Sequence, residues 1–163
     1  MKQIRPASPE DISLIRDLAR DIWPPTYGAI ISQAQIEYML DLMYSPVSLQ
    51  KQMEDDCRFL IIEEDQKAVG FAAYQQITPD TCKLHKLYVL PSEHGKGTGR
   101  MLVNRVIGDV KEWGAKTLIL QVNKANPAKT FYDRLGFTIR EEMVLDIGNG
   151  YVMDDYVMEL AIP

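Results

Sequence analysis

The stretch that decides the fold reads Leu87-Tyr88-Val89-Leu90-Pro91-Ser92-Glu93-His94-Gly95-Lys96-Gly97-Thr98-Gly99-Arg100. An apolar, strand-like run ends at the proline, three alternating glycines follow, and a helical pattern begins near the last of them. Glycines let a backbone approach a ligand closely, and the first N–H groups of a helix attract anions. Two basic side chains add positive charge to an otherwise acidic chain. The stretch therefore predicts a loop that binds a pyrophosphate.

Two common phosphate-binding patterns do not fit this loop. A G-x-G-x-x-G pattern would need a third glycine at residue 100, which is Arg100, and no Gly-Lys-Ser or Gly-Lys-Thr occurs in the chain. A glycine-rich turn without a ligand is the simpler alternative, but it leaves the three glycines and the flanking cations unexplained.

The elements on either side of the loop predict a mixed α/β (α+β) fold. Strands are expected near residues 4–7, 58–64, 67–77, 82–90, 116–122, 137–147 and 151–160. Helices are expected from Ser8 to the Pro24-Pro25 pair, over 32–44 and 47–55, from about 99 to 113, and up to residue 135. The main order is β-α-α-β-β-β-α-β-α-β-β, which predicts a mixed, mostly antiparallel sheet with helices on both faces. Residues 116–122 are apolar enough for a strand that is buried on both faces.

Composition excludes several classes of protein. The 163 residues fit a single domain, 1–163, and the net charge of −5 argues against nucleic-acid binding. No apolar run is long enough for a membrane span, and the first residues do not resemble a signal peptide, so a cytoplasmic protein is expected. The two cysteines are isolated, so neither a metal site nor a covalent cysteine route is expected.

The loop resembles the acyl-CoA-binding motif of the GNAT superfamily of N-acetyltransferases, Q/R-x-x-G-x-G/A. Gly97 and Gly99 occupy the glycine positions, whereas His94 stands where Gln or Arg is usual, which implies a somewhat altered phosphate contact. A second motif, from Asn126 to Phe137, is similar to the Asn…Ala…Phe-Tyr…Gly-Phe pattern of the same superfamily. The resemblance implies the GNAT fold and an acetyl-CoA-dependent transferase.

The resemblance also implies where acetyl-CoA would bind. The strand that carries the backbone of Leu87, Tyr88 and Val89 would pair with the pantetheine arm, where this strand and the next separate from each other. Asn126 and Lys129 would lie near the middle of the cofactor. The phosphates would contact the loop residues His94, Gly95, Lys96, Gly97, Thr98, Gly99 and Arg100.

Acetyl transfer needs a neutral amine and a proton for the leaving thiolate. Deprotonating a primary amine at pH 7 costs about 4.6 kcal/mol, so a base is needed. Tyr132 stands where the superfamily carries its general acid, although a core tyrosine is the plainer alternative. Some members use a Glu as base, but Lys83 occupies the matching position here, so His85 is the expected proton relay. A structurally bonded histidine is the alternative.

The acceptor is less defined by the sequence than the donor. Trp23 and Tyr27 precede the helix with which the superfamily usually builds its acceptor wall, and Asp154 and Asp155 would attract a cationic amine. The C-terminal segment is similar to a bacterial branch that includes diamine and polyamine acetyltransferases. Peptide N-termini, amino acids and aminoglycosides remain open. A homodimer remains open as the oligomeric state. The alternative function is that of a non-catalytic acyl-CoA-binding regulatory domain.

Overall fold

The computed structural model describes residues 1–163 and contains one seven-stranded sheet with the strand order β1-β2-β3-β4-β5-β7-β6. All neighbouring strands are antiparallel except β4 and β5, which are parallel. This confirms the predicted mixed sheet. The strands are β1 (Lys2–Pro6), β2 (Arg58–Glu64), β3 (Lys67–Gln76), β4 (Thr81–Val89), β5 (Thr117–Asn123), β6 (Thr138–Gly148) and β7 (Tyr151–Ala161).

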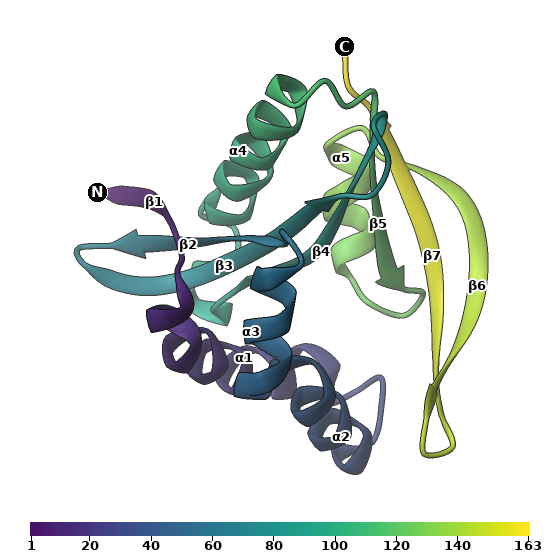
Figure 1. Ribbon diagram of the computed structural model, residues 1–163. Coiled ribbons are helices and arrows are strands. Elements are labelled where there is room, and N and C mark those ends of the chain that lie inside the picture. Colours follow the sequence, from purple (N-terminus) through teal and green to yellow (C-terminus); the bar gives the residue numbers. More distant parts are fainter.

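Helices cover both faces of the sheet, as predicted (Figure 1). One group consists of α1 (Ile12–Tyr27), α2 (Gln33–Tyr44) and α3 (Pro46–Glu54), and the other consists of α4 (Thr98–Glu112) and α5 (Ala128–Arg134). Short 3-10 turns, η1 (Pro9–Asp11) and η2 (Pro91–Glu93), precede α1 and the glycine loop. Strand alternation divides the apolar residues of β2 and β3 between two hydrophobic cores, one under each group of helices.

The prediction that Pro24 and Pro25 end the first helix is wrong, because α1 continues through both to Tyr27. Each proline removes one hydrogen bond to a carbonyl four residues earlier. Both prolines lie on the exposed side of the last turn, where water can satisfy those carbonyls. Thr26 Oγ1 donates to the Ile22 carbonyl at 2.7 Å and strengthens this turn. The continued helix fixes the position of Tyr27, which matters for the site.

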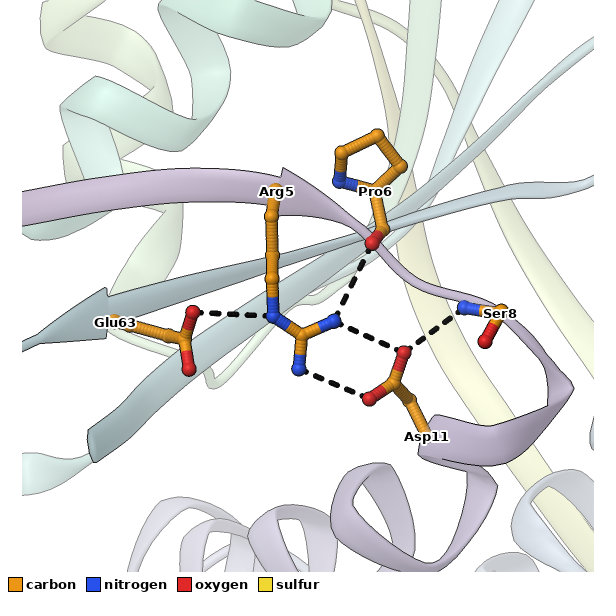
Figure 2. A network of polar contacts seen from close by, with 5 residues as sticks. All are labelled: Arg5, Pro6, Ser8, Asp11 and Glu63. Atoms are coloured by element: carbon orange, nitrogen blue, oxygen red, sulfur yellow. Dashed lines mark hydrogen bonds and ion pairs between the residues drawn. The ribbon is translucent and has the colours of Figure 1, made fainter. Parts of the chain in front are cut away.

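Arg5 fastens β1 to the start of α1 (Figure 2). Its guanidinium donates to both carboxylate oxygens of Asp11, at 2.9 and 3.0 Å, and to Glu63 of β2 at 3.1 Å. The Asp11 carboxylate also accepts the backbone N–H of Ser8 at 2.9 Å. The hydrogen bonds from Arg5 lower the pKa of Asp11. The carboxylate therefore helps to cap the first turn of the helical region.

The C-terminal hairpin confirms the predicted turn between the last two strands. Asn149 and Gly150 both have positive φ, 56° and 79°, as a two-residue type I′ turn requires. The tip of the hairpin is bonded to α2: Tyr38 Oη donates to the Ile147 carbonyl at 2.7 Å, and Gln35 Nε2 donates to the Val152 carbonyl at 3.0 Å. The hairpin is therefore held beside the first group of helices.

The expectation that the central apolar strand is buried on both faces is wrong. In β5 only alternate residues, Leu118, Leu120 and Val122, are buried, and they pack under α4 and α5. The residues between them remain partly exposed on the opposite face, because α1 packs on β3 and β4 rather than on this strand (Figure 1). That half-open face becomes part of the candidate site.

Candidate active site

The sheet opens in its middle, between β4 and β5. These parallel strands pair from Thr81–Thr117 to Leu84–Leu120, and the pairing stops there. Beyond that point β4 stays paired with β3 as far as Val89, and β5 stays paired with β7 as far as Asn123. The two strands diverge (Figure 1), which is the separation that the sequence resemblance implied. Backbone groups on the facing edges of both strands consequently lack a strand partner.

A bulge bends β4 where the opening begins. The register between β3 and β4 shifts between Ala73 and Tyr74, so that Lys86 opposes Ala73 and Leu84 opposes Tyr74. His85 is the extra residue between these pairs. A bulge re-aims side chains and increases local twist. It therefore contributes to turning β4 away from its parallel neighbour.

The glycine loop presents a row of free donors at the start of α4. The first helical hydrogen bond runs from Met101 N to the Gly97 carbonyl, and the N–H groups of Gly97, Thr98, Gly99 and Arg100 donate no hydrogen bond within the protein. Together with the helix dipole, these donors form an anion-binding end.

The glycines keep this loop open and close to α5. Gly95 and Gly97 both have φ of +80°, a conformation that other residues rarely adopt, and a Cβ on either would meet no atom within 4 Å. A Cβ on Gly99 would lie 3.3 Å from Phe131 Cζ, so this glycine permits close packing of α4 against α5. The first two glycines therefore shape the loop, and the third sets the distance between the helices.

The loop also has an internal brace that sequence reasoning missed. Glu93 is only 5% exposed, accepts a hydrogen bond from Thr98 Oγ1 at 2.9 Å, and lies 3.7 Å from Lys96 Nζ. The Thr98 side chain therefore faces inward, and only its backbone N–H is available to a ligand. His94, Lys96 and Arg100 are exposed around the loop.

Tyrosines from three different elements lie around the opening, and two of them are in contact. Tyr27 of α1 and Tyr88 of β4 have their hydroxyl oxygens 3.0 Å apart. Tyr132 of α5 is 7% exposed and packs between Phe131 and Phe137. Burial raises the pKa of Tyr132 above its usual value, and the Tyr27 hydroxyl adds to the rise. Because α1 and α5 cover opposite faces of the sheet, the opening brings these two side chains together.

Asn126 and Lys129 lie at the start of α5. Asn126 Oδ1 accepts the Ala128 N–H at 2.9 Å, and the Asn126 side chain lies near Tyr27, where it opposes the rise in the pKa of that phenol that burial causes. Lys129 Nζ pairs with Asp133 at 2.8 Å and lies 5.8 Å from the centre of the Tyr156 ring. Asn126 is therefore part of the group around the opening, whereas Lys129 is paired within its own helix.

The two adjacent aspartates of β7 have different surroundings. Asp154 is exposed and forms a 2.9 Å ion pair with Lys124. Asp155 is 1% exposed, and its Oδ1 has no hydrogen-bond partner. Burial, and secondly the charge of Asp154, raise the pKa of Asp155 to about 6. Only one of the two aspartates therefore belongs to the interior of the site.

The surroundings of His85 and Trp23 differ from those expected for a proton relay and for an acceptor-binding residue. His85 Nε2 lies 3.0 Å from Gln75 Oε1, and its ring lines a small cavity with Cys57 and Lys86. Although the residue is exposed, partial burial of the ring and the charges of Lys83 and Lys86 lower its pKa to about 4. Trp23 is 2% exposed and packs in the core, so it supports Tyr27 instead of forming an open wall.

No group of three or more His, Cys, Asp or Glu side chains is arranged to hold a metal ion. No helix has both the length and the apolar composition needed to cross a membrane.

Comparison with known proteins supports the geometric interpretation. An uncharacterised N-acetyltransferase of Mycobacterium tuberculosis is 28% identical over 150 residues, which cover 91% of this chain and 96% of that protein. The spermidine N(1)-acetyltransferase of Thermoplasma acidophilum is 28% identical over 145 residues, covering 85% of this chain and 89% of that protein. The crystal structure of the PaiA N-acetyltransferase of Thermoplasma acidophilum in complex with coenzyme A matches with a TM-score of 0.84 and 26% identity, covering 99% of both chains.

The family assignment follows from the extent of these matches. The model of the acetyltransferase (GNAT) family matches residues 14–137, a range that includes the glycine loop, the opening between β4 and β5, and α5. The protein therefore belongs to the acetyltransferase (GNAT) family.

Proposed function

We propose that this acetyltransferase uses acetyl-CoA to acetylate a primary amine, by direct attack of the amine on the thioester, and that its preferred acceptor is a diamine or polyamine. The observation that carries the proposal is the juxtaposition of two features. A row of free N–H donors lies at the start of α4, and the helix that packs against this start through Phe131, α5, carries the buried phenol of Tyr132.

The loop fits the phosphate end of acetyl-CoA. Unpaired N–H groups, open space above Gly95 and Gly97, and the exposed cations Lys96 and Arg100 would together accept a pyrophosphate. From there the pantetheine arm would follow the free edge of β4 at Leu87–Val89. A solved structure with 26% identity is a complex with coenzyme A, which supports the choice of this ligand.

Tyr132 is suited to protonate the leaving sulfur. A free thiol has a pKa near 8.5 and a phenol near 10. Burial keeps the Tyr132 phenol protonated, and the same buried surroundings would raise the pKa of a thiolate that leaves beside it. The phenol would donate only as negative charge develops on the sulfur. Tyr88, bonded to Tyr27, would support the opposite side of the thioester.

A cationic acceptor is supported by charge and by similarity. The chain has a net charge of −5, and a relative over 85% of the chain is a spermidine acetyltransferase. Net negative charge raises the local concentration of a polycation and its rate of association. Small amines with one charge and peptide N-termini remain the competing acceptors. The non-catalytic alternative has no support, because the relatives with a named activity are acetyltransferases.

The decisive test replaces Tyr132 by Phe and measures transfer from acetyl-CoA to a panel of amines. We expect kcat to fall by about 10²–10⁴-fold, while acetyl-CoA still raises the melting temperature as in the parent. Tyr74→Phe is the matched control, since it removes a half-buried hydroxyl that bonds to Asp109 of α4, away from the opening. If Tyr132→Phe keeps kcat within about threefold, Tyr132 is only structural.

The same panel tests the acceptor. Spermidine should exceed a monoamine of similar length by about five- to tenfold in kcat/KM at low salt, and the preference should shrink as salt screens the charges. Equal values for the two amines would reject the polyamine preference, and acetylation of N-terminal peptides alone would identify the competing class of acceptor.

A further inference from the structure

A buried carboxylate without a partner lies beside the opening. Asp155 is almost completely inaccessible, and its Oδ1 accepts no hydrogen bond. Buried charges are normally paired or hydrogen-bonded, and exceptions concentrate at functional sites. This side chain therefore needs an explanation that packing does not provide.

The groups around Asp155 leave it without a compensating ion pair. Lys83 of β4, on the far side of β5, is one candidate, but its Nζ donates to Gln121 Oε1 of β5, and no ion pair joins it to the aspartate. Gln121 lies close enough to oppose the rise in the pKa of Asp155, but its Nε2 donates to Met143 Sδ at 3.2 Å. Lys124 is bonded to other acids, Glu142 and Asp154.

The remaining neighbours belong to β7 and α1. The charge of Asp154 adds to the rise in the pKa of Asp155, and the Asp155 charge in turn raises the pKa of the Tyr27 phenol. The aspartate is therefore held in a partly polar environment in which its carboxylate is a stronger base than an ordinary one.

The position of Asp155 in the sheet places it opposite the acid. It pairs with Asn123, the last residue of β5, beyond the level where β4 and β5 separate. The next residue, Tyr156, has its ring near Lys129 of α5, so by strand alternation Asp155 faces the other side of the sheet, where Tyr27 lies. Tyr132 belongs to α5 and is buried on the opposite face of the sheet.

We infer that Asp155 is the catalytic base that accepts a proton from the acceptor amine, an inference that rests on the function proposed above. The acceptor arrives as an ammonium ion and gives one proton to the Asp155 carboxylate, which leaves a neutral amine. The nitrogen then forms a bond to the acetyl carbon, the C–S bond breaks, and the sulfur takes the proton of Tyr132. The second proton shed by the nitrogen restores Tyr132, and Asp155 releases its proton to solvent.

His85 is the competing base. Its ring is bonded to Gln75 and lines a cavity with Cys57 and Lys86, and no contact joins it to the tyrosines at the opening. The aspartate, by contrast, pairs with the end of β5 beyond the level where β4 and β5 separate, on the face of the sheet that carries Tyr27, which is bonded to Tyr88. Geometry therefore favours Asp155 over His85.

The test compares Asp155→Asn with Asp154→Asn, which removes the same charge from the adjacent residue. With the preferred amine, Asp155→Asn should lower kcat by about 10²–10³-fold while the melting-temperature shift caused by acetyl-CoA is kept. Asp154→Asn should stay within about threefold of the parent. In the parent, log(kcat/KM) should steepen below about pH 6, because the carboxylate that accepts the proton of the ammonium ion is then itself protonated, and the Asp155→Asn profile should lack this steepening.

Further experiments distinguish the remaining explanations. Should Asp155→Asn fail to fold, Asp155→Ala with added formate provides a second test, and recovery of at least tenfold in kcat supports the base. Unchanged kcat with a raised KM would show that Asp155 only binds the amine and would overturn the inference. Loss of the steepening in His85→Gln instead would assign the base to His85. A parent that binds acetyl-CoA but acetylates no amine would reject the proposed function itself.

Discussion

Asp155→Asn should make the protein more stable at neutral pH while it impairs catalysis. The carboxyl is buried, and its pKa is raised from 3.8 in the reference state to about 6 in the folded protein. As pH rises from about 4, the unfolded chain loses this proton before the folded protein does. The free energy of unfolding therefore falls between about pH 4 and 6 and stays lower above pH 6. Replacing the acid by an amide removes this penalty.

The size of the effect follows from the pKa difference. A rise of about two pKa units corresponds to a destabilisation of at most about 3 kcal/mol by the charged carboxylate. The cost of burying the new amide offsets part of the stability gained by removing that charge. A net gain of about 1–2 kcal/mol is expected at pH 8. For a chain of this length it corresponds to a rise of about 2–8 °C in melting temperature. Near pH 4 the gain should almost vanish, because the carboxyl is then neutral in the folded protein.

Thermal melts of the parent, Asp155→Asn and Asp154→Asn from pH 4 to 8 measure this prediction. Asp154 is exposed and bonded to Lys124, so its variant should show no comparable gain at pH 8. A melting-temperature difference between Asp155→Asn and the parent that does not change with pH would refute the reasoning. Lower stability of Asp155→Asn at pH 8 would show that the folded protein stabilises the charged carboxylate.

Two further predictions concern the loop and the start of α1. Gly97→Asp should remove most of the acetyl-CoA-induced rise in melting temperature, because its carboxylate would face the pyrophosphate. The control Gly150→Asp changes a glycine with nearly the same positive φ and equally open surroundings, and it should keep the rise. A folded Gly97→Asp variant with an undiminished rise would contradict the loop assignment. Asp11→Ala should lower the free energy of unfolding by about 1–2 kcal/mol at pH 7, measured in urea, because it removes the carboxylate bonded to Arg5. Since the pKa of Asp11 is lowered in the folded protein, its contribution to the free energy of unfolding should disappear as pH falls below about 4. If Asp11→Ala lost no more stability at pH 7 than the exposed control Asp65→Ala, this prediction would be contradicted.

Local sequence patterns predicted most of the architecture, because turns, caps and periodicity act over a few residues. The type I′ turn at Asn149-Gly150 and the cap at Ser32 are examples, since each depends on neighbours in the chain. The Pro24-Pro25 pair misled the prediction, because its effect depends on which side of the helix faces water, and that is decided by tertiary packing. The same dependence explains the partly exposed face of β5.

The site was predictable where motifs are contiguous and unpredictable where it joins distant strands. The glycine loop and Tyr132 could be located from their motifs. The different surroundings of Asp154 and Asp155 could not, because burial of one and exposure of the other depend on how β7 pairs with β5. The bulge at His85 could not be recognised in the sequence, and Glu93 gave no signal that it would brace the loop.

The opening in the sheet is bounded at two places that do not touch the reacting atoms. At one end, four residue pairs join β4 to β5, and at the other end the hairpin tip is bonded to α2 through Tyr38 and Gln35. Together these contacts hold the borders of the opening in place. The spacing of these contacts limits how far β4 and β5 can separate. A change in either set of contacts would therefore alter the opening mechanically, although neither set touches the reacting groups.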